Sequence, residues 1–257
     1  MRIAHLSDLH LLEPAQGRGL GVRFVSLGRP LDPGERFRKT LRAIDVARRA
    51  GAEHFVFSGD LTETGTAAQF EALAAALAEA RLAPDEVTLV PGNHDAYDAP
   101  DGWRRALDGP LRAYAPGAAL EPAKVVERRG VMVLPVDGTF YQPVTRSAGR
   151  MTRELAAAIE QRLRDPALRA APVVVAIHHP PHRRPGPWHW VDGLLGCDAL
   201  LSAIARRPNV TLMHGHLHRA VDRGHGLARV VGAGAVVDGA RVAVHDVVSN
   251  RSLDLVA

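Results

Sequence analysis

The chain has 257 residues, of which 46% are hydrophobic and 5% aromatic, and it contains one cysteine. This length suits one α/β core, and a lone cysteine, Cys197, excludes an internal disulfide, so we expect a single domain over residues 1–257 in a reducing compartment. The first residues already form an apolar strand, and no run of about 18 apolar residues follows. We therefore expect a soluble, cytoplasmic protein without a membrane segment.

The net charge is +4 and the pI is near 9.8, a balance that suits an acidic partner such as nucleic acid. However, 30 of the 32 basic residues are arginine, scattered through alanine-rich segments. Aromatic residues are too few for a base-stacking platform, and they do not alternate with basic ones. Nucleic acid is therefore a possible but weakly supported partner, and the oligomeric state is left open.

Apolar strands alternate with helical periodicity along most of the chain. We expect helices over 35–50, 67–82, 101–113, 154–163 and 194–206, and strands over 2–7, 54–58, 86–90, 123–128, 131–136, 173–177 and 210–213. The tail favours antiparallel strands over 219–223, 228–231, 241–248 and 252–256, separated by glycine turns. This order predicts two sheets packed face to face with helices outside. The segments 11–34 and 180–192 are expected to be loops beside the site.

Five of the predicted strands end in side chains that bind metals. The side chains are Asp8 and His10, Asp60, Asn93 and His94, His178 or His179, and His216 and His218. Ligands of open α/β sheets gather at such carboxyl ends. The spacings suit two adjacent cations about 3.5–4 Å apart with one carboxylate shared between them. Either member of the pair His178-His179 offers the required imidazole.

The ordered set Asp8-x-His10, Gly59-Asp60, Gly92-Asn93-His94-Asp95, His178 and Gly215-His216-x-His218 resembles the calcineurin-like metallophosphoesterase superfamily. The resemblance runs from residue 5 to residue 218. Within the superfamily, the segments 59–65, 91–95 and 215–218 are similar to the branch that contains bacterial class III cyclic-nucleotide phosphodiesterases. The resemblance implies a four-layer α/β/β/α sandwich of two mixed sheets flanked by helices.

The resemblance also implies a ligand set for two metal ions. One ion is held by Asp8, His10 and His218, a second by Asn93, His178 and His216, and Asp60 bridges them. The family's pattern favours His178 over His179. Mixed nitrogen and oxygen ligands suit two divalent or mixed-valence transition metal ions, with Mn, Fe, Zn and Co all compatible.

These residues predict an enzyme that hydrolyses a small phosphodiester, such as a cyclic nucleotide, by attack of a metal-bound hydroxide. His94 follows Asn93 directly, so we expect its ring to face the same cavity. There it would donate a proton to the leaving group. Asp95 is expected to orient His94 rather than to bind metal. Two alternatives remain, a nuclease of the same superfamily and a non-catalytic metal-binding interaction protein.

The loop at 180–190 carries Arg183, Arg184, Trp188 and Trp190 close in sequence to the candidate ligands. It suits recognition of a base or aryl group, with Arg183 and Arg184 as candidate phosphate-binding cations. The alternative is a packing loop in which both tryptophans are buried.

Overall fold

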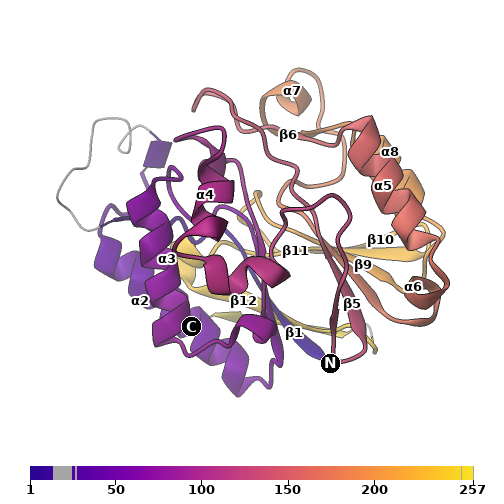
Figure 1. Cartoon of the computed structure of the whole chain (residues 1–257), viewed down its shortest axis with the longest axis horizontal. Helices are drawn as coiled ribbons and strands as arrows, with labels where there is room; N and C mark the ends of the chain where they lie inside the picture. Colours follow the sequence, from indigo (N-terminus) through magenta and orange to yellow (C-terminus); the bar gives the residue numbers. More distant parts are fainter. Residues whose placement is uncertain (14–24, 27, 250, 257) are drawn as a thin grey trace.

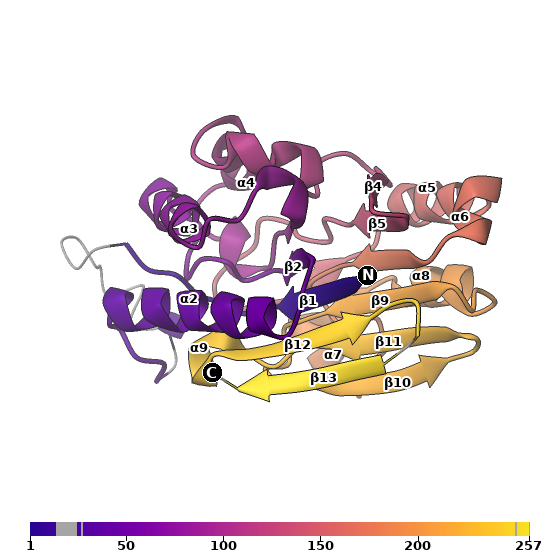
Figure 2. The same ribbon diagram turned by 90° about the horizontal axis from the view of Figure 1, so that it is seen from below.

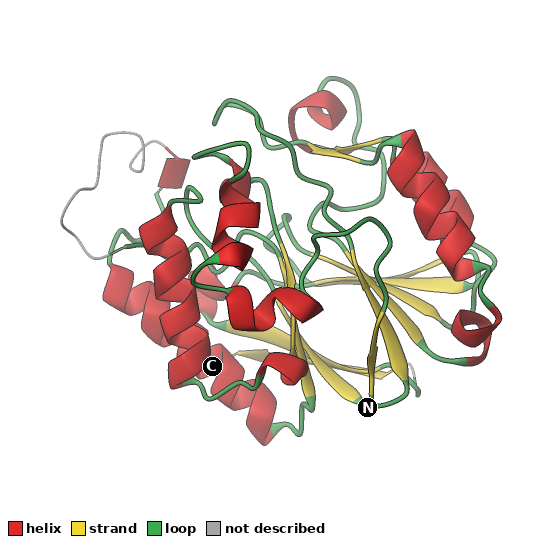
Figure 3. Cartoon of the chain, in the orientation of Figure 1, coloured by secondary structure: helices red, strands yellow, loops and turns green. Residues whose placement is uncertain are grey.

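The computed structural model describes residues 1–13, 25–26, 28–249 and 251–256, which form four layers (Figure 1). Two sheets lie in the middle, with helices on the outer side of each, as Figure 3 shows by colour. The view in Figure 2 shows the second sheet beside the first. This arrangement confirms the predicted sandwich. Most of the predicted loop at 11–34, namely 14–24 and 27, lies outside the described residues.

The first sheet has the strand order β13-β12-β1-β2-β3. Its strands are β1 (Arg2–Leu6), β2 (His54–Ser58), β3 (Val87–Val90), β12 (Arg241–Asp246) and β13 (Arg251–Val256). The strands β1, β2 and β3 run parallel, whereas β12 is antiparallel to both β1 and β13. The carboxyl ends of the three parallel strands therefore meet at one edge of the sheet.

The second sheet has the order β10-β11-β9-β7-β5-β4. Its strands are β4 (Val126–Arg128), β5 (Val131–Pro135), β7 (Val173–Ala176), β9 (Val210–His214), β10 (Val221–His225) and β11 (Ala228–Gly232). The four central strands are parallel, and β4 and β10 are antiparallel edge strands. A small parallel pair, β6 (Gly149–Arg150) and β8 (Leu194–Leu195), lies beside it.

Among the described residues, three of the helices pack on the first sheet and three others on the second. They are α2 (Pro33–Arg49), α3 (Ala67–Glu79) and α4 (Gly102–Asp108) on the first, and α5 (Arg153–Leu163), α6 (Pro166–Ala170) and α8 (Cys197–Ile204) on the second. Side-chain oxygens of Asp32, Thr66 and Thr152 cap α2, α3 and α5 by accepting backbone N–H bonds. Shorter elements complete the described chain: α7 (Trp188–Asp192), α9 (Val236–Gly239) and the 3-10 helices η1 (Pro84–Glu86), η2 (His94–Ala96) and η3 (Arg112–Gly117).

Strand alternation divides the core into three layers. Ile3, Val56 and Val174 point between the sheets, where they form a small apolar cluster. Their neighbours Phe55 and Val175 point outward, toward the helices. Because the central strands β1, β2, β3, β7 and β9 are buried on both faces, they read as nearly continuous apolar runs in the sequence. This burial fixes the register, and so fixes where each strand ends.

Four local features differ from the sequence prediction. The predicted helix over 101–113 ends at Asp108, because Gly109 leaves helical geometry before Pro110. The helix predicted over 194–206 begins only at Cys197, because Gly196 has a left-handed backbone and 194–195 form β8. The predicted loop at 180–192 contains α7. The tail is antiparallel within its two hairpins, but β11 lies parallel to β9. Among the described residues, no helix combines the length and the apolar character that crossing a bilayer requires.

Candidate metal centre

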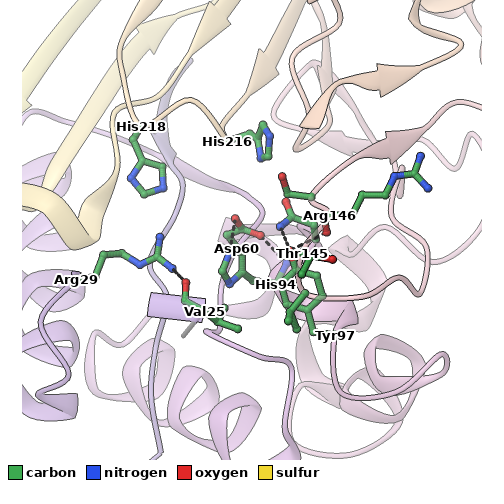
Figure 4. Close-up of a pocket in the computed structure, with 12 residues that line it drawn as sticks. Val25, Arg29, Asp60, His94, Tyr97, Thr145, Arg146, His216 and His218 are labelled. Atoms are coloured by element: carbon green, nitrogen blue, oxygen red, sulfur yellow. Dashed lines mark hydrogen bonds and ion pairs between the residues drawn. The ribbon is translucent and has the colours of Figure 1, made fainter. Parts of the chain in front are cut away.

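The ligands predicted from the sequence come together where the carboxyl ends of the two sheets meet. Figure 4 shows Asp60, His94, His216 and His218 facing one cavity, although they follow different strands. We use the name metal cradle for the seven candidate ligands, Asp8, His10, Asp60, Asn93, His178, His216 and His218. Asp8 and His10 follow β1, Asp60 follows β2, Asn93 follows β3, His178 follows β7, and His216 and His218 follow β9.

One half of the cradle consists of Asp8, His10 and His218, which bring three ligand atoms within 4.8 Å of one another. His218 Nε2 lies 3.3 Å from Asp8 Oδ1, and His10 Nε2 lies 4.0 Å from the same oxygen. Asp8 Oδ1 and His10 Nε2 are buried and lack a hydrogen-bond partner in the described structure. Such atoms carry a desolvation cost unless a cation satisfies them, so this donor set fits a metal ion.

The other half contains His178, His216 and Asn93. His178 Nε2 lies 3.2 Å from Asp60 Oδ2, and both His178 Nε2 and Asn93 Oδ1 are buried without a hydrogen-bond partner. Asp60 Oδ2 is also 3.9 Å from His10 Nε2, in the first half of the cradle. The Asp60 carboxylate therefore faces both halves, the position that a bridging ligand needs.

Four hydrogen bonds orient the ligand side chains from outside the cradle. His218 Nδ1 contacts Asp238 Oδ2 at 2.8 Å, and His178 Nδ1 donates to the Ser58 carbonyl at 2.7 Å. His216 Nε2 donates to the Asp192 carbonyl at 3.0 Å, and the Asn93 amide nitrogen donates to the Tyr97 hydroxyl at 2.8 Å. Each of these bonds uses one polar atom of the ligand side chain and leaves its other polar atom available for a metal. Outer-shell partners of metal ligands orient them in this way.

The rings of His178 and His179 point in different directions, although a ring nitrogen of His179 also lies within 4.8 Å of those of His178 and His216. His178 directs its free Nε2 at Asp60. His179 instead uses Nε2 on the Ser147 carbonyl at 2.9 Å, and its ring packs so closely on Gly149 that an added Cβ there would lie 2.4 Å from Nδ1. His179 therefore anchors the segment around Ser147 to the site.

The carboxylates of the site raise the pKa values of two of the ligand histidines, whereas burial lowers that of a third. Burial opposes the charged form of His178, but Asp60 and Asp8 outweigh it and raise its pKa to about 9. His218 behaves alike: burial lowers its pKa, and hydrogen bonds to Asp238 and Asp8 raise it to about 10. Burial lowers the pKa of His216 to about 3, with His178 adding to the shift. These carboxylates thus favour positive charge in the cradle, the charge that a bound cation would supply.

The glycines in the motifs allow the ligand loops to approach one another. Gly59 has φ +96°, and a Cβ there would lie 2.4 Å from His178 Nδ1. A Cβ on Gly92 would lie 2.2 Å from Asp60 Oδ1. Five ligands also have left-handed backbones: Asp8 (φ 56°), His10 (50°), Asp60 (50°), His216 (69°) and His218 (54°). Strained backbone of this kind gathers at functional sites.

His94 lies where the sequence predicts, but Asp95 does not orient it. His94 Nδ1 lies 2.7 Å from the Glu63 carbonyl, which leaves Nε2 toward the cavity, 4.0 Å from Asp60 Oδ2. The Asp95 carboxylate turns back and accepts hydrogen bonds from the backbone of Leu61, Thr62 and Gly92. The predicted role of Asp95 is therefore wrong, because its carboxylate fixes the loop that follows Asp60. Burial, with Asp60 adding, raises the Asp95 pKa to about 7.

The cavity over the cradle has a volume of about 400 Å³. Its walls include Arg29, from the segment 11–34 that was expected beside the site, and also Tyr97 and the segment 144–147, which the sequence did not indicate. Asn93 and Tyr97 are four residues apart, the spacing of neighbours on a helical turn, and this was the available signal for Tyr97. The cations predicted from the sequence are engaged elsewhere: Arg183 pairs with Asp198, and Arg184 with Asp192.

The layered fold and the histidine-aspartate cluster at its strand ends define a dimetal phosphoesterase. The profile of the calcineurin-like phosphoesterase family matches residues 1–220, and the chain belongs to that family. Members hold a dinuclear transition-metal centre, and the described His and Asp groups fit such a centre.

Two solved structures are similar to this chain in fold. A dimetal phosphatase from Danio rerio is 14% identical with a TM-score of 0.68, and the match covers 95% of this chain and 91% of that one. An archaeal phosphodiesterase is 10% identical with a TM-score of 0.51, and the match covers 100% of both chains. A comparison of the sequence with curated proteins gives no match.

Proposed function

We propose that the protein is a dinuclear metal-dependent phosphodiesterase that hydrolyses a small phosphodiester. The observation that carries the proposal is the set of buried, unpartnered ligand atoms on both sides of Asp60, with His94 beside them at the cavity wall. In this proposal Asp8, His10 and His218 hold one ion, Asn93, His178 and His216 the other, and Asp60 bridges. Mixed nitrogen and oxygen ligands favour Mn, Fe, Zn or Co over Ca or Mg.

Bound ions of this kind activate water and polarise a phosphoryl oxygen. The residues of the chain have two further tasks, to place the ester and to move a proton. Two carboxylates, Asp8 and Asp60, do not neutralise two divalent ions, so the site retains positive charge for a phosphate anion. The backbone N–H of His94 donates to Asp60 Oδ1 at 2.9 Å, which holds the carboxylate and the His94 ring in a fixed relation.

His94 is the proposed proton donor to the departing alkoxide. Its Nδ1–H is held by the Glu63 carbonyl, so Nε2 is the atom that gives up the proton. The side chain is 12% exposed, which lets the ring meet the leaving group at the cavity wall. General-acid catalysis contributes about 10²–10⁴-fold to rates.

The proposed preference is for a diester over a monoester. A monoester dianion has three non-bridging oxygens and needs extra cationic donors. Among the described residues that line the cavity, Arg29 has its charge partly compensated, because its Nη2 donates to Glu63 Oε1 at 2.7 Å as well as to the Val25 carbonyl at 3.0 Å. A diester monoanion has two such oxygens and gains contacts through its second substituent.

The test compares kcat/KM for bis(p-nitrophenyl) phosphate and p-nitrophenyl phosphate under each of the four metals. We expect the diester to be preferred, with 2′,3′- or 3′,5′-cyclic nucleotides among the substrates. A preference for the monoester would overturn the diesterase assignment. Two bound metals without turnover of either ester would instead support the non-catalytic alternative.

A further inference from the structure

A surface of aromatic and cationic side chains lies beside the mouth of the cavity. We call it the rim and define it as Phe140, Arg146, Arg150, Trp188 and Trp190. The two tryptophans are 59% and 60% exposed, so they are not the buried residues of a packing loop. They come from α7, whereas Phe140, Arg146 and Arg150 come from the segment that leads into β6 and from β6 itself.

Arg146 connects the rim to the cavity. It lines the cavity, and its guanidinium carbon lies 4.2 Å from the centre of the Trp190 ring and 5.2 Å from that of Phe140. Its Nε donates to the Trp190 carbonyl at 2.9 Å. Figure 4 shows the side chain extending along the wall, away from Asp60 and His94. The guanidinium therefore lies against Phe140 and Trp190 rather than over the metal cradle.

A second arginine lies on the same aromatic ring. The guanidinium carbon of Arg150 is 4.3 Å from the centre of Phe140. Burial lowers the pKa of Arg146, and the charge of Arg150 lowers it further, as expected for neighbouring like charges. In the portion of the chain that is described, neither guanidinium has a carboxylate partner. The pair is a region of uncompensated positive charge, which attracts anions.

The rim is held at a fixed place relative to the cradle. The Tyr97 hydroxyl accepts from the Asn93 amide at 2.8 Å and donates to the Arg146 carbonyl at 3.1 Å. The neighbouring Ser147 carbonyl binds His179, and the Ser147 N–H donates to the Val191 carbonyl at 2.9 Å. The cations of the rim thus lie at a set separation from the ester at the metals.

We infer that the rim is a subsite for a second anionic group, so the preferred substrate is a linear nucleotide diester that carries a further phosphate beyond the scissile one. This inference rests on the proposed phosphodiesterase activity and deepens it. Arg146 and Arg150 bind the further phosphate, and the exposed faces of Trp188 and Trp190 stack with a base, as aromatic side chains do in single-strand binding sites. A cyclic mononucleotide has one phosphate and leaves the arginines unused.

The test measures kcat/KM for thymidine dinucleotides with a terminal phosphate at either end, for the dinucleotide without one, and for bis(p-nitrophenyl) phosphate. We expect the terminal phosphate to raise kcat/KM about tenfold, the effect of one charge-assisted contact, and the gain to shrink as salt rises. In Arg146→Met, the ratio of kcat/KM with the terminal phosphate to kcat/KM without it should fall close to one. Arg183→Met, which removes an exposed arginine paired with Asp198, is the matched control and should leave the ratio unchanged.

Failure of the subsite and failure of the proposed function give different results. If bis(p-nitrophenyl) phosphate is cleaved but the terminal phosphate gives no gain, the subsite is overturned and the phosphodiesterase stands. If no diester is cleaved, binding to the rim can still be tested by the quenching of tryptophan fluorescence in metal-free protein. Thymidine 3′,5′-bisphosphate should then quench wild-type protein at lower concentration than thymidine, and Arg146→Met should remove the difference. Equal quenching by both ligands would overturn the subsite.

Discussion

The cradle and the rim border the same cavity but are built differently. Every ligand of the cradle follows the carboxyl end of a buried strand, and one ring nitrogen of each of His178, His216 and His218 is held by a hydrogen bond. The side chains of the rim come from a loop and two short elements, with Phe140 and Arg146 half-buried and Arg150, Trp188 and Trp190 exposed. Rigid placement suits the reacting centre, where small displacements cost rate, whereas the rim only has to attract and orient the remainder of the substrate.

Replacing Asp60 should have the largest effect, because its carboxylate faces His10 in one half of the cradle and His178 in the other. We expect Asp60→Ala to bind less than one equivalent of metal and to lose at least about 10³-fold in kcat, more than the 10–100-fold typical of outer-shell changes. Elemental analysis of the folded protein measures the first effect. The control is Asp45→Ala, which removes an exposed carboxylate paired with Arg49. Two full equivalents in Asp60→Ala would exclude the bridging role.

His94→Gln should separate chemistry from metal binding. We expect metal content to stay at the wild-type level and kcat to fall about 10²–10⁴-fold on alkyl diesters, whose leaving group needs a proton. The loss should be much smaller on bis(p-nitrophenyl) phosphate. His225→Gln, on the edge strand β10, serves as the control. An equal loss on both substrates would point to positioning by His94 instead of proton donation.

Asp238→Asn tests the hydrogen bond that orients the candidate ligand His218, and it leaves all seven ligands of the cradle in place. The carboxylate of Asp238 holds His218 Nδ1 and makes the ring a stronger ligand, so we expect metal affinity to fall about 10–100-fold. Competition with a chelator measures the affinity. Asp222→Asn, which affects a carboxylate paired with Arg229, should leave the affinity unchanged. Wild-type affinity in Asp238→Asn would argue against His218 as a ligand.

Tyr97→Phe should have the smallest effect and the most specific one, because this hydroxyl joins the cradle to the rim. We expect a loss of a few fold in metal affinity, about 1 kcal/mol for one hydrogen bond, together with a smaller gain from a terminal phosphate. Tyr114→Phe removes a hydroxyl bound to the Leu82 carbonyl, far from the cavity, and is the control. If neither quantity changes, the two regions are independent.

The same contrast explains how far the sequence predicts the site. The ligands could be named because each follows an apolar run, and the four-layer sandwich follows from the alternation of strands and helices. The strand pattern alone does not separate His178 from His179, since both follow the same strand and only their ring contacts differ, and it is the family's pattern that favours His178. The prediction that Asp95 orients His94 is wrong. Adjacency to His94 in sequence does not reveal that its carboxylate turns back toward Leu61 and Thr62.

Trp188 and Trp190 could be named from the sequence, but Asp238, Arg146 and Arg150 could not, for a different reason. Asp238 meets His218 across 20 residues, and Arg146 meets Trp190 across 44. Such contacts depend on how loops return to the site, and a periodic pattern carries no information about that. The dispersed arginines also gave no sign that Arg146 and Arg150 would share one aromatic ring.

The left-handed backbone at five of the candidate ligands narrows which amino acids these positions tolerate. Outside glycine, the residues that enter this region most readily are asparagine, aspartate and histidine. Glutamate or cysteine at Asp8 or Asp60 would keep a metal-binding group but lose this conformational tolerance and shift the ligand atom. Two requirements therefore favour Asp and His at these positions: metal binding and a left-handed backbone. A designer who wishes to change the metal preference has more freedom at Asn93 and His178, whose backbones are not left-handed, than at the other five.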